Sequence, residues 1–303
     1  MTTTLAPPVR SESAIEPLAQ PSGVREEGYY GLPFLKRPLW GWEISLYFFF
    51  EGVSSGAFLF SAVADLFGGK RHRNLVRQAR YLACASMLPC PFLLIKDLGR
   101  PARFLHMLRI LKLESPMSVG AWSLNAYGQQ VTALALINLA PRLPRPLRKL
   151  LSWLPERLVM LSAIPFGLIM MAYPGVLLET TSVPAWRTTR FLGPLIAASS
   201  VSTAEAALSL VLPRRHPEME TIGQIARAAE TAALAGYLSE AGPAGKSMTR
   251  GRYGPLFWIG AVGAGIVAPF ALSLRRPARP RKILPSLLAL AGGLALKWVL
   301  VHG

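Results

Sequence analysis

Long apolar runs separated by short basic stretches dominate this chain. About 20 apolar residues are needed to cross a bilayer. Runs near that length predict eight membrane-spanning helices, at residues 42–67, 77–96, 119–139, 158–178, 190–212, 224–240, 255–274 and 283–301. The sixth run is the weakest because it holds Arg227, Glu230 and Glu240, so it is expected either to be buried among other helices or to lie partly at the interface. The pattern predicts an all-α polytopic membrane protein with both termini on one side.

The first 38 residues follow a different pattern. They are rich in Pro, Ser, Thr and Glu and contain no apolar core of a secretory signal. We expect residues 1–38 to be a disordered tail, because such a composition cannot bury enough apolar surface to fold. Residues 39–303 are then one transmembrane domain.

Composition supports a membrane protein over a soluble or nucleic-acid-binding one. Hydrophobic residues make up 51% of the chain and charged residues 16%, and mean hydropathy is +0.35. The net charge of +17 comes from bases that gather between apolar runs, at 70–77, 141–149 and 275–282. Loops at an anionic membrane surface have this character. Loops after the odd-numbered helices hold about 15 Lys and Arg and the other flanks about 13, an excess that favours termini on the outer face.

Residues that could hold a redox centre are scarce. Cys84 and Cys90 form no metal-binding pattern. Bis-histidine haem in a membrane bundle needs imidazoles inside the spans, whereas all four histidines lie in predicted loops or at the terminus: His72, His106, His216 and His302. We expect no haem, no iron–sulfur cluster and no metal in this chain, so any redox role must use a diffusible cofactor or a partner's centres.

The first predicted helix carries acidic residues at membrane depth. Glu43, Tyr47 and Glu51 are spaced four apart, which stacks them on one face over roughly 12 Å. A carboxylate in the bilayer costs a few kcal/mol, so its default interpretation is functional. The alternative is that Glu43 reaches the interface and Glu51 hydrogen-bonds a neighbouring helix. Gly52 and Gly56 form a GxxxG pair and predict close helix packing.

Further charged residues fall in other predicted helices. Glu179, Glu205 and Lys297 could combine with Glu51 in a proton-conducting array, because desolvated carboxylates exchange protons near neutral pH. Separate structural or interfacial roles are the alternative.

The connection between the second and third predicted helices is strongly basic. Gly99 permits a sharp turn out of the second helix. Phe104, Leu105, Leu108 and Leu111 then face one way at helical spacing, which predicts a short amphipathic helix lying in the interface. The opposite side carries Arg100, Arg103, His106, Arg109 and Lys112. This helix serves either as a lipid anchor or as a docking surface.

Three motifs together resemble one family. DLGRPARFLHML followed by SPMSVGAW is similar to the signature connection of the NrfD family, the membrane subunits of polysulfide reductase-like complexes. GWEISLYFFFEGVSSGAFL resembles that family's first helix, and AYPGVLLETTSVPAW resembles its tyrosine segment. The resemblance runs in order from about residue 40 to 212, and the later helices agree only in length and number.

This resemblance implies two four-helix bundles without a cofactor of their own, in the bacterial cytoplasmic (inner) membrane. It implies electron exchange between menaquinone or ubiquinone and a ferredoxin-like subunit with [4Fe-4S] clusters. That subunit would serve a molybdopterin catalytic subunit or a multihaem cytochrome. The remaining partner is membrane lipid, and no nucleic acid is expected.

The resemblance also implies a quinone pocket. The positions that match it are Glu43, Tyr47, Asp97, Arg100, Arg103 and Tyr173. Tyr47 or Tyr173 would donate a hydrogen bond to one quinone carbonyl, and Asp97 or Glu43 would accept a proton. Arg100 would keep Asp97 ionised or orient it.

The basic side chains from Arg103 to Lys112 would then dock the soluble partner. Two departures from the family's pattern, Pro174 and Glu51, leave the proton route open.

Two other functions fit parts of the pattern. A secondary transporter or proton channel would also use intramembrane carboxylates, but it predicts an internal repeat with broken helices, which the sequence does not show clearly. A purely structural membrane anchor would tether the iron–sulfur subunit without touching quinone.

Overall fold

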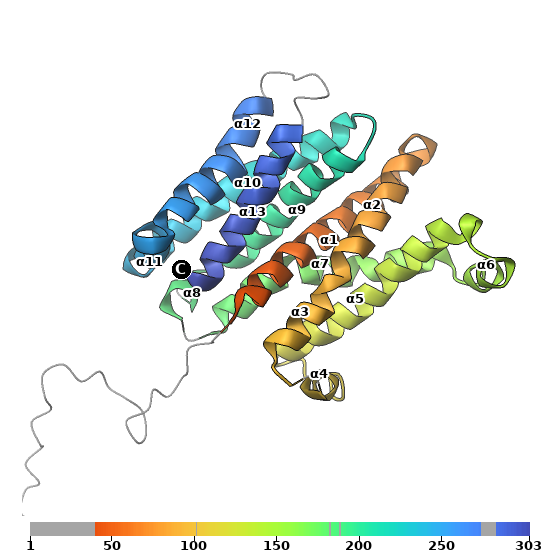
Figure 1. Cartoon of the computed structure of the whole chain (residues 1–303), viewed down its shortest axis with the longest axis horizontal. Coiled ribbons are helices and arrows are strands. Elements are labelled where there is room, and N and C mark those ends of the chain that lie inside the picture. Colours follow the sequence, from red (N-terminus) through yellow and green to blue (C-terminus); the bar gives the residue numbers. More distant parts are fainter. Residues whose placement is uncertain (1–39, 101, 182, 188, 274–282) are drawn as a thin grey trace, which may run out of the picture. The chain divides into compact units, whose positions relative to one another are not determined.

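The computed structural model describes residues 40–100, 102–181, 183–187, 189–273 and 283–303, except the side chains of Lys70, Arg103 and Ser273. The predicted tail, residues 1–38, lies outside the described residues. Those described form helices and no strands (Figure 1). The fold class predicted from the apolar runs, all-α, is therefore confirmed.

The long helices follow the apolar runs. They are α1 (Trp42–Phe67), α2 (Arg73–Met87), α3 (Pro89–Asp97), α5 (Pro116–Leu139), α7 (Glu156–Glu179), α9 (Leu192–Val211), α10 (Pro217–Ala241), a π-helix (Leu256–Val267) that continues into α12 (Ala268–Ser273), and α13 (Ile283–His302). The short helices between them are α4 (Ala102–Met107), α6 (Arg145–Leu151), α8 (Pro184–Arg187) and α11 (Lys246–Thr249).

Each predicted run is helical, with two differences in extent. The second run begins earlier, at Arg73, and is broken at Leu88, because Pro89 and Pro91 supply no backbone N–H to continue the ladder. The sixth begins seven residues earlier than predicted, at Pro217.

Within the described part of the chain, five helices are long and apolar enough to cross a membrane. They are Trp42–Phe67, Glu156–Glu179, Leu192–Val211, Gly251–Leu272 and Ile283–His302. The count of eight spans stays a prediction.

Helix α1 lies at the centre of the packing. It contacts α2, α7 and α9, while α5 packs on α7 and α2 (Figure 1). On the other side of α9 lie α10 and α13, and the π-helix packs on α13. The arrangement as two four-helix bundles stays a prediction.

Glycines set the distance between α1 and α9. A Cβ at Gly52 would come 2.6 Å from the Ser200 hydroxyl oxygen, and one at Gly56 would come 2.6 Å from the Ala204 Cβ. No larger side chain fits at either position without moving the helices apart. The interpretation of the GxxxG pair as a packing motif is confirmed.

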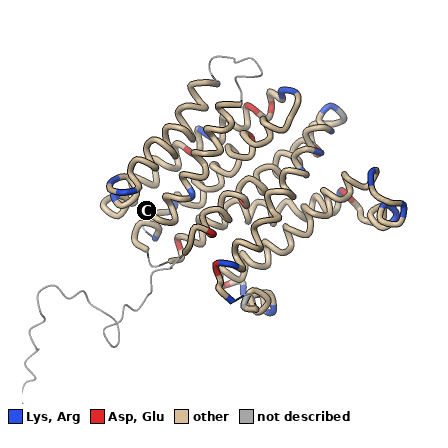
Figure 2. The backbone as a smooth tube through the Cα atoms, viewed as in Figure 1, with Lys and Arg blue, Asp and Glu red and all other residues tan. Residues whose placement is uncertain are grey.

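The start of α1 and the end of α13 are neighbours. The Ser45 hydroxyl and His302 Nδ1 lie 3.2 Å apart. We call this the near end of the helices and the opposite end, where α1 finishes, the far end. The α9–α10 turn lies at the far end, because Glu218 is 3.7 Å from His72 just after α1. Lys and Arg gather at both ends, with few between them (Figure 2).

A buried arginine ties the first helices together at the far end. Arg80 on α2 is 1% exposed and pairs with Asp65 on α1 at 3.2 Å and with Glu156 on α7. It also donates to Asn138 on α5 and to Ser61 on α1, each at 3.3 Å. The interaction joins four helices, and the sequence offered no sign of it.

Candidate functional site

A cavity at the near end brings three of the predicted site residues together. Its volume is about 80 Å³, and Tyr47 of α1, Asp97 of α3 and Tyr173 of α7 line it. Most of the remaining lining is apolar and includes Trp40 and Phe104. Because these polar side chains belong to segments far apart in the sequence, their convergence is a property of the fold.

Asp97 is the acidic group at this cavity. It is half-buried, and its Oδ1 accepts a hydrogen bond from the Gly41 N–H at 3.3 Å. Burial raises the pKa of Asp97 above its ordinary value of 3.8, the Gly41 hydrogen bond lowers it, and the charge of Glu43 raises it again. A carboxyl group with a raised pKa accepts a proton more readily than an ordinary aspartate.

The charged residues around Asp97 have other positions and partners than the sequence predicted. Glu43 does not line the cavity, and its carboxylate pairs with Lys96 at 3.2 Å. Lys96 also lies over the Trp42 ring, 4.2 Å from its centroid. Arg100 is exposed and forms no ion pair with Asp97 in this structure, so its role toward that carboxylate stays a prediction. The side chain of Arg103 lies outside the described residues.

The Ser-Pro-Met-Ser segment fixes the connection beside the cavity. Ser115 caps α5 by accepting a hydrogen bond from the Ser118 N–H at 3.4 Å. The Ser118 hydroxyl in turn donates to the Ile110 carbonyl at 3.3 Å and accepts from the Lys112 N–H at 3.0 Å. These backbone groups are the ones a longer helix would have used, so α4 ends at Met107 and the prediction of a helix reaching Lys112 is wrong.

Two motif residues without a predicted role shape the cavity wall. Gly120 of α5 lies directly against Tyr173, and a Cβ at Gly120 would overlap the tyrosine ring. Trp186, the last residue of the third motif, donates from its ring nitrogen to the Leu300 carbonyl at 2.8 Å and stacks on Trp40, with centroids 5.4 Å apart. The presence of a glycine and a tryptophan inside the quoted motifs was the available signal for both.

Comparison with known proteins identifies this architecture. The family described as Polysulphide reductase, NrfD matches residues 32–303. The chain belongs to the NrfD family. The match continues through the last helices, where the motifs had given only length and number.

Two relatives are components of reductases by name. The C component of polysulfide reductase from Wolinella succinogenes is 24% identical, over 87% of this chain and 93% of that protein. The C component of selenate reductase from Mesobacillus selenatarsenatis is 32% identical over 88 residues, which are 29% of this chain and 20% of that protein. This NrfD protein is therefore a multi-pass integral membrane subunit of a reductase complex.

The surface around the cavity of this NrfD protein is basic. Gly99 turns the backbone out of α3 with φ +66°, which confirms the predicted turn. His106, Arg109 and Lys112 follow, and all three are exposed. Their role in docking a partner stays a prediction.

The predicted proton-path residues have separate surroundings. Glu51 is fully buried one turn after Tyr47, close enough for an electrostatic interaction, but neither of its oxygens makes a hydrogen bond of ordinary geometry to a described residue. Glu179 accepts a hydrogen bond from the Gly193 N–H at 3.4 Å, at the start of α9. Glu205 pairs with Arg227 inside a network of α9 and α10. Whether these residues carry protons stays a prediction.

Proposed function

We propose that this NrfD protein is the quinone-reacting, electron-transferring membrane subunit of a respiratory reductase complex. The supporting observation is the near-end cavity, in which Tyr47, Asp97 and Tyr173 converge within a largely apolar lining. Concave apolar sites with a few convergent polar groups are typical of ligand pockets. A quinone head group, a flat apolar ring with two carbonyl oxygens, matches that distribution of polar groups.

The chemistry assigned to the pocket balances. Oxidation of a quinol releases two electrons and two protons. A tyrosine hydroxyl, from Tyr47 or Tyr173, donates a hydrogen bond to one quinone oxygen. Asp97 accepts a proton from the other oxygen, passes it to water directly or through the neighbouring Glu43, and then accepts the second proton. Quinone reduction runs through the same steps in reverse.

The electrons need a partner, because this chain is expected to hold no redox centre. We propose that they pass between quinone, as menaquinone or ubiquinone, and [4Fe-4S] clusters of a ferredoxin-like subunit. That subunit would dock on the basic side chains of Arg103, His106, Arg109 and Lys112. A molybdopterin subunit or a multihaem cytochrome would complete the complex. Eight spans in two four-helix bundles, the bacterial inner membrane and termini on the outer face belong to the same proposal.

Two substitutions in the assembled complex test the pocket. Asp97→Asn removes the proton acceptor and Tyr173→Phe removes one hydrogen-bond donor, so both are expected to abolish quinol-linked electron flow while the complex still assembles. Glu114→Gln and Tyr253→Phe make the same chemical changes outside the cavity and should have no effect. Unchanged quinol oxidation in both pocket variants would eliminate the proposed site.

Two alternatives remain, and the same variants separate them. A purely structural anchor predicts that neither pocket substitution changes electron flow. A secondary transporter or proton channel is the second candidate because charged side chains are buried among α9, α10 and α13. That network is independent of the pocket.

A further inference from the structure

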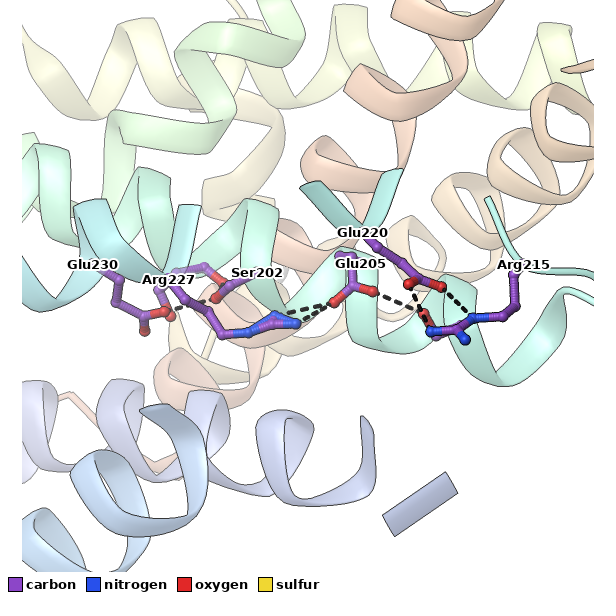
Figure 3. A network of polar contacts seen from close by, with 8 residues as sticks. Ser202, Glu205, Arg215, Glu220, Arg227 and Glu230 are labelled. Atoms are coloured by element: carbon purple, nitrogen blue, oxygen red, sulfur yellow. Dashed lines mark hydrogen bonds and ion pairs between the residues drawn. The ribbon is translucent and has the colours of Figure 1, made fainter. Parts of the chain in front are cut away.

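One face of α9 is polar along half its length. Ser199, Ser202, Glu205 and Ser209 recur at spacings of three or four residues. Ser202 and Glu205 point toward α10 (Figure 3), and Ser199 contacts α13. They cover a rise of roughly 15 Å along the helix. Exposing these polar side chains to lipid would cost free energy, and here neighbouring helices cover them.

The stripe binds charged side chains from both neighbours. Arg227 of α10 donates to the Glu205 carboxylate at 3.1 and 2.5 Å, and the Ser209 hydroxyl donates to the same carboxylate at 2.8 Å. One turn deeper, Ser202 donates to Glu230 of α10 at 2.7 Å (Figure 3). Lys297 of α13 donates to Ser199.

Two cavities lead from the far end to this stripe. The outer one, about 550 Å³, lies at the α9–α10 turn, and the inner one, about 70 Å³, reaches Glu205 and Arg227. They share Ser209, Arg215 and Glu220 in their walls, so they are adjacent. Arg215 and Glu220 form an ion pair at 3.0 Å at this junction. The cavities together are a polar inlet that ends at the buried ion pair.

Two of the four inner charges, Glu230 and Lys297, form no direct ion pair with each other. Glu205, Arg227, Glu230 and Lys297 are each at most 8% exposed and sum to zero net charge. Glu230 and Lys297 interact electrostatically, but each hydrogen-bonds to a serine and they form no ion pair within 4 Å. Buried opposite charges recover most energy in direct contact. Serine hydroxyls both donate and accept, so charges separated by hydroxyls are suited to passing protons.

We propose that the far-end cavities form a water-filled inlet through which protons move between the aqueous phase and Glu205, Glu230 and Lys297. A proton from water binds the Glu205 carboxylate. Water in the inlet carries a proton from Glu205 to the Ser202 hydroxyl, which gives its own proton to Glu230. A further water then passes a proton from Glu230 to Lys297, which accepts it as the neutral amine. Each step breaks one O–H bond and forms one O–H or N–H bond, and no electrons are transferred.

The inlet itself is independent of the quinone proposal, whereas its coupling to turnover rests on the proposed function. A structural link exists, because Ser200 on the same stretch of α9 contacts Gly52, the residue after Glu51. Only the contact between α9 and α1 therefore separates the polar network on α9 from the acidic face of α1.

Cysteine labelling tests the inlet without any assumption about quinone. Ser286→Cys places a thiol in the inner cavity, and Leu287→Cys is the control on the adjacent outward side of α13, both in a protein whose native Cys84 and Cys90 are serine. A membrane-impermeant cationic thiosulfonate is added separately to each side of sealed proteoliposomes. Ser286 is 7% exposed and Leu287 is 51% exposed.

A water-filled inlet predicts that Ser286→Cys reacts at least tenfold faster than Leu287→Cys, and only from the far-end side. Lipid exposure without an inlet predicts the reverse order. Equal or slower reaction at Ser286→Cys would overturn the proposal.

Turnover of the whole complex tests the proton movement. Glu230→Gln is expected to reduce the protons moved per electron at least twofold while uncoupled quinol oxidation continues, and the exposed Glu218→Gln should leave the ratio unchanged. Glu205→Gln alone would strand Arg227, so the double Glu205→Gln/Arg227→Gln variant, which removes both charges, is the second measurement. A wild-type ratio in both would overturn proton passage. If the wild-type complex oxidises no quinol, the proposed function fails and the labelling alone decides the inlet.

Discussion

Gly120→Ala should displace Tyr173 and weaken quinone binding. Gly120 of α5 lies where Tyr173 of α7 crosses it, and an added methyl group would overlap the tyrosine ring. Gly128 lies two turns later on the same helix, where a Cβ would come 3.4 Å from the Met87 Cε, the end of a flexible side chain. The two substitutions are chemically identical and differ only in what the methyl group meets.

The expected magnitude follows from that difference. Glycine to alanine inside a helix gains about 0.8–1.0 kcal/mol from backbone propensity, and both variants share this gain. Overpacking a filled position costs about 1–3 kcal/mol, and only Gly120→Ala incurs it. Gly120→Ala should therefore be less stable than Gly128→Ala by about 1–3 kcal/mol. If Tyr173 also loses a hydrogen bond to quinone worth about 1.4 kcal/mol, affinity falls about tenfold.

Two measurements check this prediction. Unfolding of the purified protein in detergent gives the stability difference between the Gly120→Ala and Gly128→Ala variants. Titration with a short-chain quinone, followed by quenching of tryptophan fluorescence, gives their relative affinities. Equal stability and equal quinone affinity in the two variants would show that Gly120 does not position Tyr173.

Three further perturbations test other parts of the structure. Arg80→Leu should destabilise the protein by about 1.5–3 kcal/mol, because it removes the charged hydrogen bonds that join α2 to α1, α5 and α7. The exposed Arg77→Leu should change little in the same detergent unfolding assay. Equal unfolding midpoints in the two variants would show that Arg80 does not hold the four helices together. The rate of quinol oxidation should fall as the pH decreases toward the pKa of Asp97, which burial raises above 3.8, because the protonated carboxyl group can no longer accept a proton. Asp97→Glu, which keeps a carboxyl group in a changed position, should shift this decline in rate along the pH axis. An unchanged pH profile would show that another group is responsible for the decline. Replacing Arg103 and Arg109 together by glutamine should lower co-purification of the soluble partner relative to two α6 arginines replaced likewise. Co-purification at wild-type yield would reject this docking surface.

Hydropathy predicted the bounds of a helix well where the helix and the apolar run begin and end at the same residues. The bounds of α1 match the first apolar run at both ends. The start of α10 was missed because Pro217 to Gly223 is mostly polar, yet Met219 in this segment packs in the core and supports a helix that begins before the apolar run. The end of α4 was missed because it depends on hydrogen bonds from Ser118, which lies in the next helix.

The candidate site was only partly predictable from the sequence. The spacing of Glu43, Tyr47 and Glu51 predicts a shared helix face, but no spacing places Asp97 beside Tyr173. That expectation came from the motifs alone, and the cavity agrees with it. The role of Arg80 could not have been predicted, because its partners come from three other helices and a single buried arginine leaves no periodic pattern.

The two polar regions of this protein differ in a way that suits different tasks. At the near end, the cavity offers neutral hydroxyls and one half-buried carboxyl group, so a neutral ligand can enter without separating an ion pair. Along α9, the polar groups are charges held in pairs or by serines, and the proposed inlet opens to them from the opposite end. A ligand as apolar as quinone would have to displace those charges in order to bind. A proton, by contrast, can be transferred between neighbouring hydroxyl groups without displacing them. Electron chemistry at one end and proton exchange at the other therefore need no shared residue, and the contact of Gly52 with Ser200 is the place where α1 and α9 could couple them.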